Sequence, residues 1–292
     1  MPGARAPSRG VVDSAVSAVR AHAASGAGPR TLAIDIGGSG LKADVLDPQG
    51  RMLVDRVRVP TPVGESPRVV IEALAKLVAP LPAYDRIAVG FPGVVRDGRI
   101  LTAVNLGHPG WVGFDLARAL TARLGKPARV ANDADVQGLA VVRGRGVELV
   151  ITLGTGFGTA LYLDGRLAPH LELAHHPFRK GETYEEQLGN AARRRVGRRK
   201  WSRRLEKAVV LLRALVHFDH LYIGGGNARK LRLRPDPDTT IISNEAGIRG
   251  GVALWQSDGQ GGAKMAAAKG GSGVGGAARA DREARRGGRR SR

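Results

Sequence analysis

The sequence contains no cysteine, and only 4% of its 292 residues are aromatic. Without thiols, the protein has no disulfides, no thiolate metal site and no cysteine nucleophile. Runs of about 18 apolar residues are also absent, so we expect no membrane-spanning helix. Residues 1–29 are rich in Ala, Gly and Ser but lack the compact apolar segment of a secretory signal, which favours a disordered leader on a cytoplasmic protein.

The formal net charge of +20 is concentrated in two segments. Residues 193–204 (RRRVGRRKWSRR) carry a net charge of +8, and residues 258–292 carry +6. The second segment consists largely of Gly, Ala and Arg, so we predict a disordered basic tail over residues 257–292. The hydrophobic fraction of 42% is enough for one large domain or two ordinary ones in the rest of the chain.

A glycine-rich turn follows the first predicted strand, in residues 32–42 (LAIDIGGSGLK). Glycine tolerates positive φ and lets an anion approach the main chain, so such a turn can bind phosphate through backbone N–H groups. An ordinary hairpin turn is the alternative. A second turn of similar chemistry occurs in residues 153–159 (LGTGFGT), again between two predicted strands. The recurrence predicts a second half built like the first.

Other elements follow from hydrophobic spacing and capping residues. Helical spacing predicts a helix over 67–78 that begins at Pro67, and a second helix that Asp115 caps and Gly125 ends. Alternation predicts a strand over 51–59, and an apolar stripe predicts a long helix over 201–218.

Asp133 is the strongest catalytic candidate from the sequence alone. It follows a short predicted strand and lies beside Asn132 and Asp135, where open α/β sheets place their ligand crevices. A carboxylate there can accept the proton of a substrate hydroxyl as that hydroxyl attacks phosphorus. The alternative is a helix N-cap, because Asn and Asp are common capping residues.

Glu172 and His175 could hold a polyhydroxyl ligand, although a surface loop with satisfied polar groups would have the same sequence. A metal site at His170, His175 and His176 is a weak alternative, because no third or fourth ligand has the usual spacing. Residues 184–186 begin a helix, where acidic side chains are favoured by the helix dipole alone.

The basic run 193–204 contains no acidic residue, so its charges repel one another if it is only a solvated helix face. An arginine cluster of this kind suits a polyanion, either nucleic acid or a long phosphate polymer. Trp201 is its only aromatic residue, which is few for a single-strand nucleic-acid platform.

Taken together, these motifs resemble the ROK family of sugar kinases, and most closely its polyphosphate glucokinase branch. The resemblance covers residues 30–256, and eight motifs carry it in order. They are DIGGSGLK (35–42), GFPG (90–93), NLGHPGW (105–111), ANDAD (131–135), LGTGFGTAL (153–161), the pair Glu172 and His175, YIGGGNA (222–228) and NEAGIRGG (244–251).

The resemblance implies an α/β protein of the actin-like (ribonuclease H-like) fold, with two α/β domains around a central cleft. The domains would span 30–135 and 136–256, with the final helix (about 245–256) packing back on the first, and the protein would be a homodimer. The implied activity is transfer of a phosphoryl group from inorganic polyphosphate, and also from ATP, to the 6-hydroxyl of D-glucose. A strictly ATP-dependent glucokinase or glucomannokinase is the first alternative. A non-catalytic sugar-sensing or nucleic-acid-binding relative is the second, although the residues before Leu32 are too few for a helix-turn-helix domain.

The resemblance also implies roles for individual residues. Asp133 would be the general base, and Mg²⁺ would bind beside Asp35. Glucose hydroxyls would be held by Asn105, Asn132, Asp133, Glu172, His175 and Glu185, with Glu186 as a rival to Glu185. Donor phosphates or a nucleotide would contact Asp35, Gly37, Gly38, Ser39, Gly40, Lys42, Gly154, Thr155, Gly156, Gly158, Gly224, Gly225, Gly226 and Asn227. From the charge of the basic run, a polyphosphate track is predicted at Arg194, Arg195, Arg198, Arg199 and Lys200.

The sequence departs from the family pattern at three places. The cysteine-rich zinc motif of most members is missing, and residues 177–188 occupy its place, so no zinc site is predicted. Ser39 and Gly40 stand where members often have Thr and Lys, which displaces Lys42. Ala174 replaces the glycine usual between the sugar-binding Glu and His.

Overall fold

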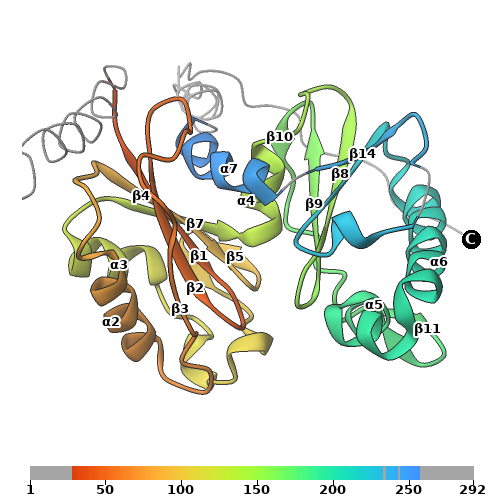
Figure 1. Cartoon of the computed structure of the whole chain (residues 1–292), viewed down its shortest axis with the longest axis horizontal. Helices are drawn as coiled ribbons and strands as arrows, with labels where there is room; N and C mark the ends of the chain where they lie inside the picture. The colour runs from red at the N-terminus through yellow and green to blue at the C-terminus, as the bar shows by residue number, and fades with distance from the viewer. Residues whose placement is uncertain (1–27, 233–234, 243, 257–292) are drawn as a thin grey trace, which may run out of the picture. The chain divides into compact units, whose positions relative to one another are not determined.

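The computed structural model describes residues 28–232, 235–242 and 244–256, and for 244–248 it describes only the backbone (Figure 1). The predicted leader and the predicted basic tail therefore lie almost wholly outside the described residues. Within the described part of the chain, no helix has the length and apolar character needed to cross a membrane.

The first half contains a five-stranded mixed sheet with the strand order β3-β2-β1-β4-β7. β1 pairs antiparallel with β2 and parallel with β4, and β4 pairs parallel with β7. The carboxyl ends of β1, β4 and β7 therefore meet at one edge, where α/β sheets form their ligand crevices. The strands are β1 (Thr31–Ile36), β2 (Leu41–Leu46), β3 (Val57–Val59), β4 (Arg86–Phe91) and β7 (Ala128–Asn132).

The second half repeats this arrangement strand for strand, in the order β10-β9-β8-β13-β14. β8 pairs antiparallel with β9 and parallel with β13, and β13 pairs parallel with β14. The prediction of a second half built like the first is therefore confirmed. The strands are β8 (Val147–Leu153), β9 (Phe157–Leu163), β10 (Arg166–Leu167), β13 (His220–Gly224) and β14 (Thr239–Ile241). Each half also has a small hairpin, β5 (Val95–Arg96) with β6 (Arg99–Ile100) in the first and β11 (Pro177–Arg179) with β12 (Glu182–Thr183) in the second.

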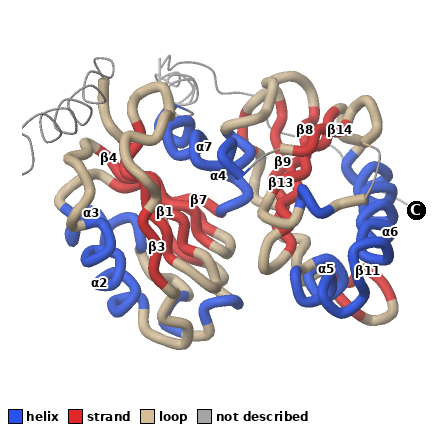
Figure 2. The backbone as a smooth tube through the Cα atoms, in the orientation of Figure 1, coloured by secondary structure: helices blue, strands red, loops and turns tan. Residues whose placement is uncertain are grey.

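Helices cover both faces of each sheet (Figure 2). Alternate residues of β1, such as Leu32 and Ile34, are buried against α2 and α3, while α5 and α6 cover the outer face of the second sheet. The helices are α2 (Pro67–Val78), α3 (Leu116–Leu124), α4 (Asp133–Leu139), α5 (Tyr184–Leu188), α6 (Asn190–Val216) and α7 (Asn244–Gln256), with 3₁₀ turns η1 (Val104–Leu106), η2 (Pro109–Trp111) and η3 (Ala228–Lys230).

Two helices connect the halves. α4 follows β7 but also contacts β8 and β9, and α7 follows β14 but contacts β1 and β4. The two helices contact each other and lie side by side between the two sheets (Figure 1). The predicted domain boundary after residue 135 falls in the first turn of α4, and that division stays a prediction.

Two glycines allow α7 to lie close to α4 and β1. A Cβ added at Gly250 would overlap the carbonyl oxygen of Val136 in α4 and lie 2.7 Å from its carbonyl carbon. At the next residue, Gly251, an added Cβ would lie 3.1 Å from the Cβ of Ala33 in β1. Gly250 is therefore required by backbone contact, whereas Gly251 meets only a small side chain.

Several local predictions are confirmed and some are wrong in extent. α2 begins at Pro67, and Asp115 caps α3 by accepting a hydrogen bond from the Arg118 N–H at 3.0 Å. The predicted strand over 51–59 is wrong in extent, because only Val57–Val59 is a strand. The side chain of Asp47 accepts hydrogen bonds from the N–H groups of residues 49 and 51, which keeps the chain in a turn before it rejoins β2. The helix predicted over 201–218 is part of α6, which begins earlier, at Asn190, is interrupted at Gly197 and ends at Val216.

Candidate active site

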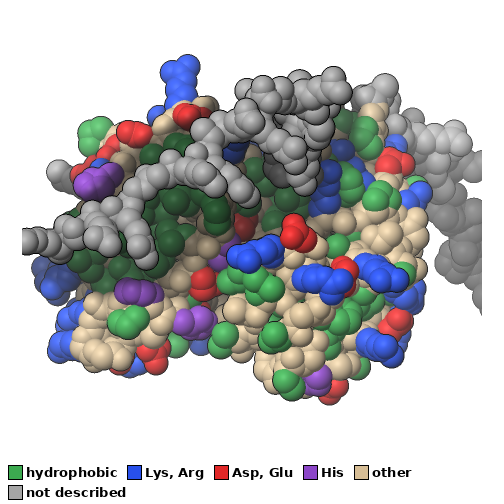
Figure 3. All heavy atoms as spheres, turned by 180° about the vertical axis from the view of Figure 1, so that it is seen from behind, with side chains coloured by type: hydrophobic (Ala, Val, Ile, Leu, Met, Phe, Trp, Pro, Cys, Tyr) green, Lys and Arg blue, Asp and Glu red, His purple; other side chains and the backbone are tan. Residues whose placement is uncertain are grey.

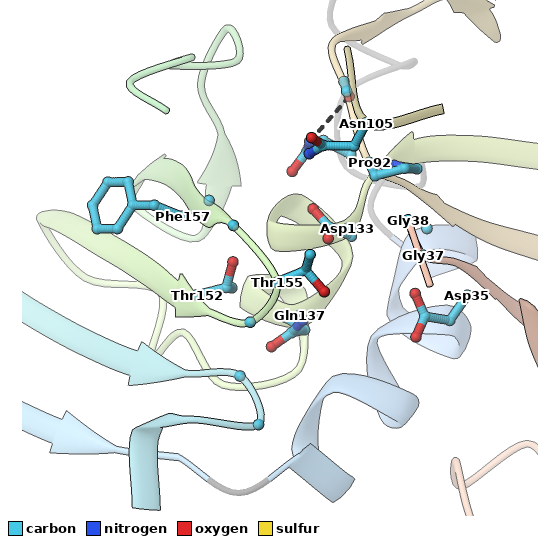
Figure 4. A pocket seen from close by; sticks show the side chains of 18 of the residues that line it. Asp35, Gly37, Gly38, Pro92, Asn105, Asp133, Gln137, Thr152, Thr155 and Phe157 are labelled. Atoms are coloured by element: carbon cyan, nitrogen blue, oxygen red, sulfur yellow. Dashed lines mark hydrogen bonds between the residues drawn. The ribbon is translucent and has the colours of Figure 1, made fainter. Parts of the chain in front are cut away.

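A cleft of about 520 Å³ is lined by residues from both halves. Its walls include the turn after β1, the turn between β8 and β9, the first turn of α4, and His170, Glu172, Ala174 and His175. Asp133 lies between the Gly37–Gly38 turn on one side and Thr155 on the other (Figure 4). The two glycine turns selected from the sequence thus belong to one site.

The first glycine turn lies between β1 and β2. The Gly37 N–H donates to the Gly40 carbonyl at 3.0 Å, and the Thr61 hydroxyl donates to the Gly37 carbonyl, so the turn is held from two sides. Asp35, the residue before it in the cleft wall, accepts a hydrogen bond from Lys42 Nζ at 2.7 Å. Lys42 therefore lies in the site despite its displacement in the sequence. All six residues predicted here, from Asp35 to Lys42, line the cleft.

The second glycine turn is fixed by contacts from α6 and from the loop after β13. Asn227 Nδ2 donates to the Gly154 carbonyl at 2.9 Å, and the Asn190 N–H donates to the Thr155 carbonyl at 3.0 Å. Gly225 has φ +84°, a conformation that favours glycine, and an added Cβ would lie 2.5 Å from the Leu153 carbonyl oxygen. Of the predicted donor-site residues in this half, Gly224 does not line the cleft, whereas Gly154, Thr155, Gly156, Gly158, Gly225, Gly226 and Asn227 do.

Asp133 begins α4, but the N-cap of that helix is Asn132. The Asn132 side chain accepts from the Ala134 N–H at 2.8 Å and donates to the Gly93 carbonyl at 3.0 Å. The N-cap role predicted as the alternative for Asp133 is therefore filled by Asn132, although Asp133 Oδ1 also accepts from the Ala134 N–H. Burial raises the pKa of Asp133, the charge of Asp35 raises it further, and the result is about 7. A carboxyl group with this pKa can accept and release a proton near neutral pH.

The residues predicted to bind sugar gather on the other side of Asp133. Glu172 Oε1 accepts from the Ala174 N–H at 3.0 Å, and the Ala174 carbonyl accepts from the Glu185 N–H at 2.9 Å. These two bonds bring the predicted pair Glu172 and His175 together with Glu185, which packs against Gly156. Asn105, on η1, also lines the cleft, whereas the rival Glu186 caps its own helix through Thr183. Their roles in sugar binding stay predictions.

The sequence did not identify several cleft residues. The sequence indicates His170 only as a weak metal ligand, but its side chain lies buried between Asp135 and Glu172. Gln137 and Thr152 also line the cleft. Gln137 lies one helical turn after Asp133, so that spacing was the one available signal.

The five residues of the predicted polyphosphate track do not lie along one surface of the cleft. Gly197, with φ 75° and ψ 160°, breaks the regular helix inside α6, and of the five track residues only Arg194 lines the cleft. Arg195 pairs with Glu182 at 3.3 Å, and Arg198 donates to the Lys230 carbonyl at 2.9 Å. Two basic residues outside the predicted track, Arg193 and Lys230, line the cleft beside Arg194.

On one face of the molecule, basic side chains are mixed with acidic ones. On the face in Figure 3, Lys and Arg side chains lie beside Asp and Glu side chains and do not form one continuous patch. We therefore define the cationic mouth as Arg193, Arg194 and Lys230, the basic residues where α6 and η3 meet the cleft.

A carboxylate suited to Mg²⁺ lies in the cleft. Mg²⁺ is usually held by one or two carboxylates, water and substrate phosphates rather than by a protein cage. The side chain of Asp35 is 45% exposed and lines the cleft, which fits that pattern. No group of three or more His, Asp or Glu residues suited to a metal ion occurs among the described residues.

Two sheets of one strand order, with glycine turns facing a shared cleft, define an α/β protein of the actin-like ATPase fold. The inorganic polyphosphate/ATP-glucomannokinase from Arthrobacter sp. strain KM has this arrangement, with 36% identity, a TM-score of 0.69, and coverage of 80% of this chain and 100% of that chain. A ROK family glucokinase from Streptomyces griseus, solved with glucose and AMPPNP, shares the fold at 19% identity and a TM-score of 0.62, over 77% of this chain and 97% of its own.

The chain belongs to the ROK family. The model of that family matches residues 31–170. The polyphosphate glucokinase of Mycobacterium tuberculosis (strain CDC 1551 / Oshkosh) is 30% identical over 242 residues, which cover 77% of this chain and 91% of that protein. The predicted fold class and family are thereby confirmed.

Proposed function

We propose that the protein is a sugar kinase that transfers a phosphoryl group from inorganic polyphosphate, and also from ATP, to the 6-hydroxyl of D-glucose. The observation that carries this proposal is the Asp133 carboxyl, with a pKa of about 7, between two glycine turns in one cleft. The similarity to a polyphosphate glucokinase and to a polyphosphate/ATP-glucomannokinase supports the donor and the acceptor.

The proposed reaction is an in-line displacement. Asp133 accepts the proton of the sugar hydroxyl as its oxygen forms a bond to the terminal phosphorus of the donor. The bond from that phosphorus to the bridging oxygen breaks, and the shortened polyphosphate or ADP leaves with the electron pair. Backbone N–H groups of the two glycine turns stabilise the charge on the transferred phosphoryl group. Glu172, His175, Glu185 and Asn105 orient the sugar.

Asp35 would hold Mg²⁺ together with donor phosphates, and the ion would supply charge neutralisation on those phosphates. In this chain, Lys42 forms an ion pair with Asp35, so its ammonium group lies close to the same phosphates. The protein groups therefore present both a carboxylate for the metal and a cation for the phosphates.

The first test is a kinase assay with glucose and Mg²⁺, with either polyphosphate or ATP as donor. We expect glucose 6-phosphate from both donors, and mannose in place of glucose measures acceptor specificity. Product from ATP alone would support the ATP-dependent alternative. Sugar binding without product from either donor would contradict the kinase proposal.

The pH dependence of the reaction is expected to follow the ionisation of Asp133. A general base must be deprotonated, so kcat/KM for glucose should rise with pH and level off above the pKa of about 7. One unit below this pKa, kcat/KM should be about tenfold lower, since each unit is a factor of ten in the deprotonated fraction. Initial rates from about pH 5.5 to 8.5, with circular dichroism to verify folding, provide the measurement. A profile with its midpoint near that of an ordinary carboxyl group would contradict the assignment.

The cationic mouth is expected to bind polyphosphate by charge. The double substitution Arg194→Gln and Lys230→Gln removes two exposed positive charges at the cleft. We expect the KM for polyphosphate to rise by about tenfold, because charge-assisted hydrogen bonds contribute more than neutral ones. The salt dependence of this KM should also become shallower, since fewer counterions are released on binding. The KM for ATP should change much less.

A charge-matched control uses Arg118→Gln and Lys126→Gln, two exposed residues that do not line the cleft. This pair lowers the net charge equally and should leave both donor constants unchanged. An equal loss for polyphosphate and ATP in the cleft variant, or an equal polyphosphate effect in the control, would show that the mouth does not select the donor.

A further inference from the structure

His170 is enclosed by two carboxylates in the wall of the cleft. Its Nδ1 lies 3.1 and 3.2 Å from the two carboxylate oxygens of Asp135, and its Nε2 lies 3.5 Å from Glu172 Oε2. The side chains of His170 and Asp135 are only 7% and 4% exposed, whereas that of Glu172 is 31% exposed. The imidazole therefore joins a buried acid to one that reaches the cleft.

Both ends of this connection are attached to fixed structure. Asp135 lies in the first turn of α4, two residues after the proposed base, and its backbone carbonyl accepts a hydrogen bond from the Tyr162 hydroxyl. On the other side, Thr159 donates to the Leu171 carbonyl and thereby ties the loop to β9. His170 is therefore held between α4 and a loop that is itself tied to β9.

We propose that His170, as an imidazolium ion, is a positioning residue that fixes the Glu172 carboxylate for binding two adjacent hydroxyls of the sugar acceptor. The proposal rests on the sugar-kinase function proposed above. Each oxygen of Glu172 has one internal contact, from the Ala174 N–H to Oε1 and from His170 to Oε2. A carboxylate offers about four acceptor sites, so each oxygen keeps a lone pair for a hydroxyl.

The charges around His170 favour the imidazolium form. Asp135 faces it from α4 and Glu172 from the loop, with Asp133 also near enough to interact. Burial lowers the pKa of His170, but the hydrogen bonds to the two carboxylates outweigh that effect and raise the pKa to about 9. His175 acts on Glu172 with the same sign, and the pKa of Glu172 is lowered despite its burial. Near neutral pH, the imidazolium of His170 thus lies against the Glu172 carboxylate, whereas burial raises the pKa of Asp135.

A purely structural ion pair is the simpler explanation for such a cluster. A measurement of sugar binding distinguishes this explanation from the proposed positioning role. We expect His170→Asn to weaken glucose binding by about ten- to a hundredfold, because the variant loses a charge-assisted hydrogen bond to Glu172. Isothermal titration calorimetry without donor measures this binding directly. The KM values for polyphosphate and ATP should stay within about twofold, because a positioning defect at the sugar leaves the donor turns intact. His176→Asn is the matched control, since His176 is exposed and does not line the cleft.

A double-mutant cycle with Glu172→Gln tests whether His170 acts through Glu172. We expect the double variant to bind glucose no more weakly than Glu172→Gln alone, because the two residues form one unit. Additive losses, or a His170→Asn variant that binds glucose normally, would overturn the proposal. If wild-type protein binds no sugar at all, the proposed function itself fails, which is a different result.

Wild-type protein supplies a measurement that needs no substitution. The dissociation constant for glucose should change at most a few fold as Asp133 ionises near neutral pH, and should rise as the pH passes the His170 pKa of about 9, because neutral imidazole can donate to only one carboxylate. This rise should be absent in His170→Asn. Unchanged affinity in wild-type protein one unit above that pKa, with folding verified by circular dichroism, would overturn the proposal.

Discussion

Replacing Asp133 with asparagine is expected to lower kcat by about 10²–10⁴, the usual contribution of a positioned general base. Asparagine keeps the shape of the side chain but cannot accept the hydroxyl proton. The dissociation constant for glucose, measured by calorimetry without donor, should change only a few fold, because the other sugar contacts remain. A drop in kcat with retained binding would identify Asp133 as the residue that acts in the transition state.

The same variant should be at least as stable as the wild type above neutral pH. A carboxyl whose folded-state pKa is raised binds its proton more tightly when folded, so its ionisation destabilises the fold as pH rises from about 4 to 7. Asparagine removes this cost, which comes from burial and from the nearby Asp35. We therefore expect the melting temperature of the variant at pH 8 to equal or exceed that of the wild type. Near-normal turnover, or a loss of activity that follows a lowered melting temperature, would contradict the assignment.

Replacing Gly250 with alanine is expected to destabilise the protein by several kcal/mol, at the upper end of single substitutions. The added Cβ would overlap the Val136 carbonyl oxygen, and a backbone atom cannot rotate away as a side chain can. Since α7 packs against α4 and against β1 and β4, relief of the overlap would move one of the two helices that connect the halves. Urea denaturation at constant m-value would measure the loss, and kinase activity should fall with it.

Gly251→Ala is the control one residue away. Its Cβ would lie 3.1 Å from the Ala33 Cβ and 3.5 Å from the Ala88 Cβ, a tight contact with side chains only. Alanine also gains up to about 1 kcal/mol over glycine in a helix, so the two effects should nearly cancel. Equal stabilities for the two variants would show that α7 adapts more readily than the backbone contact implies.

Much of the fold could be predicted from the sequence because local patterns and tertiary structure agree there. The apolar strand before Asp35 and the glycines after it indicate a strand and a tight turn, and the same pattern after residue 147 indicates the repeat. Capping by Asp115 and the stop at Gly125 also depend on local chemistry. The strand predicted over 51–59 was too long because Met52 forms only an isolated bridge with Leu46 and the chain bends at 53–54 before β3 begins, which alternation cannot report.

The site was predicted less completely because several of its interactions join distant parts of the chain. Asp133 and the glycine turns have recognisable sequence signals, but the contact between Asp135 and His170 spans 35 residues and has none. The basic run shows the same limit. Its composition indicates a polyanion, yet only folding brings Arg194 to the cleft with Lys230 and directs Arg195 toward Glu182.

The exchange of helices between the halves has a consequence for how such a fold can be divided. A fragment that ends after β7 and α4 would lack α7 over β1 and β4, and the complementary fragment would lack α4 over β8 and β9. Each sheet would then expose an apolar face that its own half cannot cover. The two halves therefore share a topology, but neither half covers both faces of its own sheet. The two copies resemble partners in an interlocked dimer that have been joined into one chain.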